Sequence, residues 1–218
     1  MEVLDNIYQY YDNHEITMGI YLDLHKAFDT VNHSILIEKL AVYGIRGIVL
    51  KWFTSYLENR KQYTVLANYD SGLESVKCGV PQGSVLGPLL FLIYINDIQY
   101  AVPNATLKLF ADDTNLFLHN SDPTKLFAMA NSSMSCLSEW FLANRLSLNL
   151  TKTCYSIFGP NHKITTGLKL YINNEEIQNT ECCKYLGIFI DSELKWRNHI
   201  NHIYSKLIKF VSIFIKLE

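Results

Sequence analysis

The run Thr106-Leu107-Lys108-Leu109-Phe110-Ala111-Asp112-Asp113, followed by Thr114-Asn115-Leu116-Phe117-Leu118, decides the fold of this 218-residue chain. Apolar residues flank two adjacent aspartates, which predicts two β-strands joined at a hairpin bend. Two neighbouring carboxylates at the end of a buried strand repel each other unless a cation neutralises them. Oxygen ligands of this kind suit Mg²⁺ or Mn²⁺. For the pair taken alone, a solvated aspartate-rich turn is the alternative.

The composition is that of a globular protein. Hydrophobic residues make up 49% of the chain, enough to build the core of one large or two small domains. The longest apolar run, residues 85–95, is too short to cross a bilayer, and the N-terminus has no signal-peptide pattern. We therefore expect an intracellular protein, nuclear or cytoplasmic rather than secreted, with no membrane partner.

Charge and cysteine content exclude several other classes. Five cysteines without CxxC spacing support neither a disulfide framework nor a zinc site. A net charge of −2 argues mildly against a free-standing nucleic-acid binder, which is usually basic.

Hydrophobic periodicity divides the chain into strands and helices. Strands are predicted over residues 17–22, 62–67, 155–158, 168–172 and 184–190. Helices are predicted over residues 34–42, 45–57, 84–98 and 122–144, and from about residue 199. Because they interleave without a regular βαβ repeat, we expect an α+β fold with an antiparallel sheet.

A third carboxylate, Asp23, ends the first predicted strand. If that strand neighbours the hairpin, Asp23, Asp112 and Asp113 meet at one sheet edge and could hold two divalent ions. An acid that simply begins a turn is the alternative for Asp23. Phe28, five residues later, could exclude the 2′-hydroxyl of an incoming nucleotide, with a core aromatic as the alternative.

Glycines and prolines punctuate residues 79–88. Their backbone can approach a ligand closely, and the Gln82 amide can donate to and accept from a base or sugar edge. The alternative is a purely structural role, in which this segment begins a helix with Ser84 as its N-cap.

Three blocks now stand in order along the chain: Tyr21-Leu22-Asp23-Leu24-His25-Lys26-Ala27-Phe28-Asp29, Gly79-Val80-Pro81-Gln82-Gly83-Ser84-Val85-Leu86-Gly87-Pro88 and Phe110-Ala111-Asp112-Asp113. In order and spacing they closely resemble three polymerase palm motifs of non-LTR retrotransposon reverse transcriptases, particularly the jockey-like group. The resemblance runs from about residue 15 to the C-terminus.

The resemblance implies a polymerase palm, an antiparallel sheet backed by helices with a ferredoxin-like core, and a partial thumb helix. Residues 1–195 would form the palm and residues 196–218 the start of the thumb. Only 22 residues precede Asp23, so we expect most of the fingers region to be absent.

The resemblance also implies roles for individual residues. Asp23 and Asp112 would be the principal ligands of two Mg²⁺ or Mn²⁺ ions, with Asp113 assisting. Phe28 would select the sugar, and Gln82 and Gly83 would lie against template and nucleotide. Lys152 would protonate the departing pyrophosphate, although a surface lysine without a role is the alternative. Residues 185–191 resemble the hairpin that grips the primer end, or else form an ordinary core strand.

The implied function is RNA-directed DNA polymerisation, in which an RNA template, a DNA primer and deoxynucleoside triphosphates are the partners. One alternative is an inactive retroelement remnant with at most RNA-binding activity. Another is a different palm enzyme, such as an RNA-templated RNA polymerase or an intron-encoded maturase. Phe28 favours deoxynucleotides over ribonucleotides.

Overall fold

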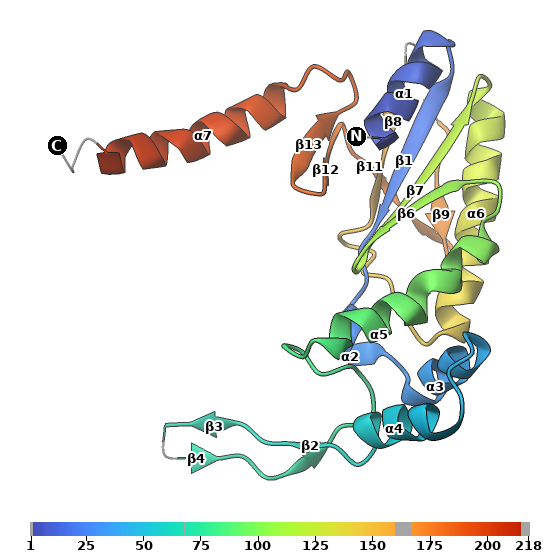
Figure 1. Cartoon of the computed structure of the whole chain (residues 1–218). Coiled ribbons are helices and arrows are strands. Elements are labelled where there is room, and N and C mark those ends of the chain that lie inside the picture. Colours follow the sequence, from blue (N-terminus) through green and yellow to red (C-terminus); the bar gives the residue numbers. More distant parts are fainter. Residues whose placement is uncertain (1, 68, 160–166, 215–218) are drawn as a thin grey trace.

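The computed structural model describes residues 2–67, 69–159 and 167–214, and it is built around one five-stranded sheet (Figure 1). Strand β1 (Ile16–Leu22) lies at its centre and pairs antiparallel with β7 (Asp113–Asn120) and β8 (Cys154–Phe158). At one edge, β6 (Thr106–Phe110) pairs antiparallel with β7. At the other, the short β11 (Gln178–Asn179) runs parallel to β8.

The four long strands have a ferredoxin-like arrangement. Their spatial order is β8-β1-β7-β6, every neighbour is antiparallel, and helical segments separate β1 from β6 and β7 from β8. The predicted α+β fold with a helix-backed antiparallel sheet is therefore confirmed. The parallel pairing of β11 makes the sheet as a whole mixed.

The helices of the chain fall into three groups. Between β1 and β6 lie α2 (Ala27–Thr30), α3 (His33–Val42), α4 (Gly47–Leu57), α5 (Leu86–Ile95) and the 3₁₀-helix η1 (Asn96–Ala101). A single long helix, α6 (Pro123–Ala143), connects β7 to β8. The helices nearest the two ends are α1 (Glu2–Asp12) and α7 (Arg197–Phe214).

Local capping signals explain why the predicted helices are confirmed. The Asn32 side chain accepts a hydrogen bond from the Ile35 amide at the start of α3, at 3.1 Å. At the start of α6, the Asp122 side chain accepts a hydrogen bond from the Thr124 amide at 2.9 Å, and Pro123 occupies the first turn. The Ser84 hydroxyl accepts from the Gly87 amide at 3.0 Å, just inside α5.

Three predicted strands differ from the structure because pairing, rather than periodicity, sets their length. The stretch 62–67 contributes two short strands to an extended arm made of β2 (Lys61–Gln62), β3 (Val65–Leu66), β4 (Tyr69–Asp70) and β5 (Glu74–Ser75). Of residues 168–172, only β9 (Tyr171–Ile172) is a strand, paired with β10 (Glu175–Glu176).

The third difference concerns residues 184–190, which do not form a single strand. They belong to a hairpin of β12 (Cys182–Tyr185) and β13 (Ile188–Asp191). Leu186 and Gly187 both have positive φ, 47° and 87°, as a tight two-residue hairpin turn requires. The hairpin implied by the resemblance is therefore present, and the core-strand alternative is wrong.

Strand β1 is buried at every position, because both faces of the sheet are covered. Its alternate residues Ile16, Met18, Ile20 and Leu22 join the main core with side chains of α5 and α6. Tyr21 points to the opposite face and joins a second cluster, whose other members are Val3, Ile7, Phe117, Phe158, Cys183 and Ile190. Helix α1 and the β12–β13 hairpin thus pack on the face away from α5 and α6.

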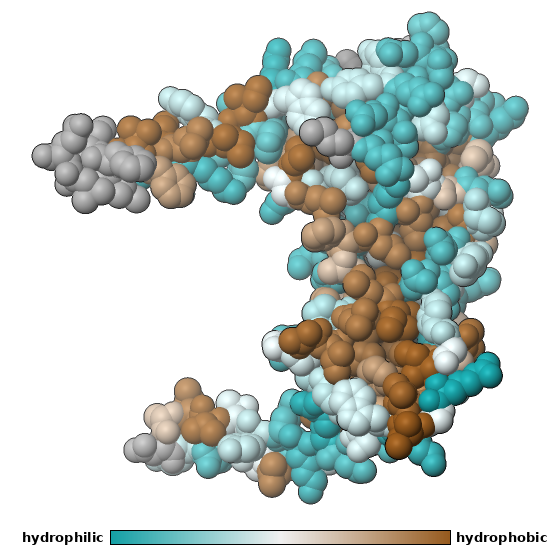
Figure 2. Space-filling model, in the orientation of Figure 1, coloured by the Kyte–Doolittle hydropathy of each residue, from teal (hydrophilic) through white to brown (hydrophobic). Residues whose placement is uncertain are grey.

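Two elements project from the same side of the molecule (Figure 1), and the space-filling view shows an open concave space between them (Figure 2). One is the arm of residues 61–75, and the other is α7. Hydrophobic residues gather along α7 (Figure 2), where Ile203, Leu207 and Phe210 are exposed. In Figure 1, the end of β1 and the β6–β7 bend lie beside this space.

Across the described residues, no helix combines the length and the apolar character that a membrane crossing requires.

Replacing Gly19 by alanine should destabilise the protein. A Cβ there would lie 2.8 Å from the Tyr21 hydroxyl oxygen and 3.0 Å from Phe117 Cε1, so these two buried rings would have to shift. We expect a loss of about 1–3 kcal/mol in the free energy of unfolding, measured by urea denaturation. Gly72→Ala, which meets open space, is the matched control. Equal stability of the two variants would contradict this packing.

Candidate active site

The sheet brings Asp23 and Asp113 to the same level on neighbouring strands. Leu22 pairs with Thr114, so continuing the register by one residue places Asp23 opposite Asp113. Side chains directly opposite each other in an antiparallel pair point to the same face. The structure therefore places the three sequence-predicted carboxylates at one edge, with Asp112 in the adjoining bend.

The bend that carries Asp112 is tight. Phe110 pairs with Asp113, which leaves only Ala111 and Asp112 in the turn. Ala111 has a φ of 52°, a left-handed conformation that costs a residue with a Cβ about 1 kcal/mol or more. Asp112 and Asp113 are exposed, so their carboxylates are accessible to ligands from solvent.

The carboxylates interact electrostatically across the two strands. Partial burial of the Asp113 carboxyl raises its pKa above the ordinary value, and the charges of Asp112 and Asp23 raise it further. Lys184 acts in the opposite direction and lowers it. The edge therefore carries concentrated negative charge that the fold itself only partly compensates.

Lys152 reaches this edge from the loop before β8. Its Nζ lies 3.9 Å from Asp23 Oδ2, and the lysine side chain is 69% exposed. The loop is held against Asp23 by its backbone, because the Asn149 amide donates to the Asp23 carbonyl at 2.8 Å and the Asp23 amide donates to Thr153 Oγ1 at 3.4 Å. The loop that carries Lys152 is thus held beside Asp23, although the ion pair formed by the exposed side chain is itself weak.

A cavity of about 330 Å³ opens beside the carboxylates. Its floor includes Tyr21, Asp23, Asp113 and Asn115, and Lys152 lies at its side. The opposite wall comes from the β12–β13 hairpin, which contributes Cys182, Cys183, Lys184, Leu186 and Phe189.

Sequence reasoning missed two polar residues of this cavity. Asn115 lies two residues after Asp113 and so shares its face of β7. The alternation of side chains along a strand could therefore have predicted its place beside the carboxylates. Lys184 could not be found from the sequence, since only the docking of the hairpin on the sheet brings it near Asp113.

The donor set fits a divalent cation that arrives with its substrate. Within residues 2–67, 69–159 and 167–214, no group of three or more His, Cys, Asp or Glu side chains is close enough to hold a metal ion. Mg²⁺ is usually bound by one or two carboxylates, with water and substrate phosphates completing its octahedron. Three exposed or half-exposed carboxylates at one edge match this open arrangement.

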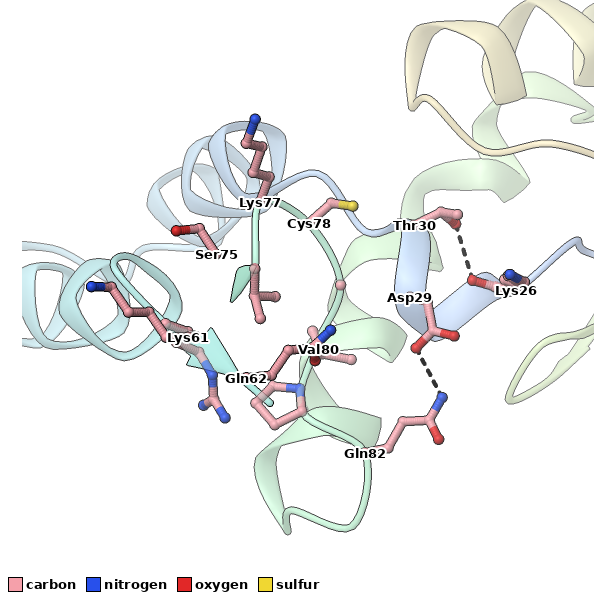
Figure 3. Close-up of a pocket in the computed structure, with 14 residues that line it drawn as sticks. Lys26, Asp29, Thr30, Lys61, Gln62, Ser75, Lys77, Cys78, Val80 and Gln82 are labelled. Carbon is pink, nitrogen blue, oxygen red and sulfur yellow. Dashed lines mark hydrogen bonds between the residues drawn. The ribbon is translucent and has the colours of Figure 1, made fainter. Parts of the chain in front are cut away.

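Phe28, Gln82 and Gly83 form a second group beside α2. The Val80 amide donates to the Phe28 carbonyl at 2.8 Å, and the Gln82 side-chain amide donates to Asp29 Oδ1 at 2.8 Å (Figure 3). A Cβ on Gly79 would lie 2.8 Å from the Asp29 carbonyl oxygen, so only glycine allows this close approach.

The second group is distinct from the carboxylate cavity. Phe28 is half-buried and its ring packs on Phe91, with centroids 4.6 Å apart. Gly83 has a φ of 79° and open space around it, and Gln82 lines a different groove. The structure therefore places Lys152 with the carboxylates, and it brings Gln82 to Asp29, next to Phe28, in a separate group.

Comparison with known proteins decides the family. The model of the family "Reverse transcriptase (RNA-dependent DNA polymerase)" matches residues 3–190, which include both groups of site residues. The chain belongs to this reverse transcriptase family. Its similarity is to the jockey-like non-LTR retrotransposon enzymes, over most of the chain.

Two relatives from Drosophila melanogaster illustrate the relationship. The RNA-directed DNA polymerase from mobile element jockey is 27% identical over 199 residues, covering 88% of this chain and 21% of that protein. The probable RNA-directed DNA polymerase from transposon X-element is 28% identical over 218 residues, covering 94% and 23%. The chain thus spans about a fifth of the length of these reverse transcriptase relatives.

Solved structures show the same fold at lower identity. A telomerase from Candida tropicalis in complex with a fragment of telomeric RNA superposes with a TM-score of 0.58 at 15% identity, covering 90% of this chain and 33% of that one. A telomerase from Candida albicans gives 0.57 at 12% identity, covering 88% and 33%. This reverse transcriptase chain therefore shares the architecture of the telomerase region.

Replacing Asp113 by asparagine should stabilise the protein at pH 7. A raised pKa means that the folded state disfavours the charged carboxylate of Asp113. The charged form therefore lowers the stability of the fold at pH values above the raised pKa. This loss of stability disappears below the ordinary pKa of 3.8, where the group is protonated in both the folded and the unfolded state. We expect the Tm at pH 7 to rise by about 1–3 °C, and the difference to close as the pH falls below about 4.

Asp70→Asn, at an exposed carboxylate in the arm, is the control for loss of one negative charge and should leave the Tm nearly unchanged. A lower Tm for Asp113→Asn at pH 7, measured by thermal denaturation, would show that the carboxylate stabilises the fold.

Proposed function

We propose that this chain carries the catalytic palm of an RNA-directed DNA polymerase, which adds deoxynucleotides to the 3′-hydroxyl of a DNA primer on an RNA template. The observation that carries the proposal is the juxtaposition of Asp23 and Asp113 by the β1–β7 register, with Lys152 3.9 Å from Asp23. Membership of the reverse transcriptase family supports the choice of reaction. A polymerase of this kind would act inside the cell, in the nucleus or cytoplasm.

Asp23 and Asp112, assisted by Asp113, would hold two Mg²⁺ or Mn²⁺ ions at the sheet edge. When bound, these ions would activate the primer hydroxyl and neutralise the charge of the departing pyrophosphate. Because Asp112 and Asp113 are exposed and Asp23 is only partly buried, metal, nucleotide and primer end could reach these carboxylates from solvent.

The remaining residues would position the substrates and move one proton. Lys152 would donate a proton from its ammonium group to the pyrophosphate as the bond to phosphorus breaks. Phe28, whose ring is backed by Phe91, would occupy the space that a 2′-hydroxyl requires. Gln82, with its amide oriented by Asp29, and Gly83 would lie against template and nucleotide.

The proposed division of the chain places the palm in residues 1–195 and the start of the thumb in residues 196–218. Helix α7 supports this division, since it leaves the sheet after β13 and contacts that strand near its own start. The Phe189 amide donates to His199 Nδ1 at 3.5 Å, and the His202 ring meets Phe189 edge-on with centroids 4.9 Å apart. The β12–β13 hairpin would hold the primer end above the carboxylates, where it already forms one wall of the cavity.

Primer extension on an RNA template with Mg²⁺ tests the proposal. Asp112→Asn should lower the rate by about 10³-fold or more, because an amide cannot supply the negative charge that the metal site needs. Asp5→Asn, an exposed carboxylate on α1, is the matched control and should keep wild-type activity.

No wild-type product above the background of Asp112→Asn would contradict the proposal and support the alternative of an inactive remnant that at most binds RNA. Equal incorporation of ribonucleotides and deoxynucleotides by the wild type would contradict the role given to Phe28.

Two substitutions can separate proton donation by Lys152 from a purely electrostatic role. If Lys152 donates a proton, both Lys152→Gln and Lys152→Arg should lower kcat by about 10²-fold or more, because arginine keeps the charge but does not release its proton. Single-turnover rates of nucleotide addition provide the measurement. Activity restored by arginine would assign Lys152 a purely electrostatic role, and full activity of Lys152→Gln would make it a surface lysine.

A further inference from the structure

A histidine at the start of α3, His33, is hydrogen-bonded to the loop that leads to Gln82. Its Nε2 lies 2.8 Å from the Gly79 carbonyl oxygen. A carbonyl oxygen can only accept, so we assign the ring hydrogen to Nε2, which donates it. His33 directly follows Asn32, the N-cap of α3, so the helix fixes the place from which the ring reaches the loop.

Two backbone hydrogen bonds lie beside this contact. The Gly79 amide donates to the carbonyl of Val31, a fully buried core residue, at 2.8 Å. The Val80 amide donates to the Phe28 carbonyl, also at 2.8 Å. Gly79 is therefore held on both sides, by the backbone of the core through its amide and by His33 through its carbonyl.

The anchor at Gly79 determines where Gln82 lies. Gln82 is exposed, and its side-chain amide is oriented by one hydrogen bond to the exposed Asp29 (Figure 3). Exposed groups of this kind exchange readily with water, so that bond alone orients the amide weakly. Pro81 restricts the intervening backbone, and a displacement at Gly79 is therefore carried on to Gln82.

The same loop holds Phe28 from the other side. Phe28 lies on α2, a helix of only four residues, which begins after Lys26 in a left-handed conformation with φ 50°. So short a helix has little stability of its own and depends on tertiary contacts. Two of these contacts are the Phe91 ring, at a centroid distance of 4.6 Å, and the Val80 amide.

We propose that His33 is a positioning residue for selection of the incoming nucleotide, because its hydrogen bond to Gly79 holds the loop that fixes both Phe28 and Gln82. The inference rests on the proposed function, in which Phe28 excludes a 2′-hydroxyl and Gln82 lies against template and nucleotide. Without the donor, the half-buried Gly79 carbonyl loses its partner and the loop can move away from α2. Phe28 would then close less tightly against the sugar.

Hydrogen exchange tests the anchor itself. In His33→Leu, which removes the donor, the Gly79 and Val80 amides should exchange about tenfold faster, because opening of the loop breaks one hydrogen bond fewer. His33→Phe, a ring without a donor, is the second variant and should behave like His33→Leu. His33→Gln, whose amide nitrogen can donate to the same carbonyl, should restore most of the protection.

The control for this measurement is a histidine elsewhere on the sheet. His119, near the end of β7, is hydrogen-bonded to Glu15 at 2.6 Å, and His119→Leu should leave the exchange of both loop amides unchanged. The amides of the buried strand β1, followed in the same samples, report any change in global stability.

Nucleotide selection provides a second measurement. In single-turnover primer extension, the ratio of kcat/KM for a deoxynucleotide to kcat/KM for the matching ribonucleotide should fall about tenfold in His33→Leu. His33→Gln should keep the wild-type ratio. A variant that merely folds less well lowers both values equally and leaves their ratio unchanged, so the ratio separates positioning from stability.

Exchange of Gly79 and Val80 at the wild-type rate in both His33→Leu and His33→Phe would overturn the proposal, as would equally fast exchange in His33→Gln. Hydrogen exchange needs no primer, template or nucleotide. Faster exchange in a chain whose wild type extends no primer would therefore count against the proposed function alone. Primer extension with an unchanged ratio in His33→Leu would count against this inference alone.

Discussion

The pairing of β1 between β7 and β8 is the constraint on which the rest of the molecule depends. Every residue of β1 is buried, so the strand contributes alternately to the main core and to the second cluster. A slip of one residue would exchange those faces and expose Met18 and Ile20 to the wrong environment. The same register that satisfies the core sets Asp23 opposite Asp113, and the hydrophobic effect thereby holds two like charges together.

The second cluster connects the sheet to the wall of the carboxylate cavity. Tyr21, Phe117 and Tyr185 make edge-to-face or tilted contacts with centroids 5.9–6.5 Å apart, and they attach the β12–β13 hairpin to β1 and β7. Cys183 and Ile190 are buried in the same cluster. The position of Lys184 beside Asp113 is therefore a consequence of apolar packing, since its own charge interaction at this exposed site is weak.

Charge in this nearly neutral chain is segregated rather than mixed. Acidic side chains gather at the end of β1 and in the β6–β7 bend, and basic ones gather at the base of the arm. At the acidic edge, the raised pKa of Asp113 reflects the cost of placing like charges together, and the tight turn adds the left-handed backbone of Ala111. Such local costs are typical of sites that are organised for binding rather than for the stability of the free protein.

Much of the fold and part of the site follow from local sequence. Asn32, Ser84 and Asp122 mark helix starts, and the alternation around Asp112 and Asp113 marks the hairpin, because capping and strand periodicity act over a few residues. Strand lengths at residues 62–67, 168–172 and 184–190 were not predictable, because short strands exist only where a partner pairs with them. The sequence motifs identified Asp23, Asp112, Asp113 and Lys152 as candidate site residues. Only the tertiary structure placed Lys184 at the carboxylate cavity and gathered Lys26, Arg60 and Lys77 into one groove, since such contacts join residues far apart in the chain and depend on how whole elements pack.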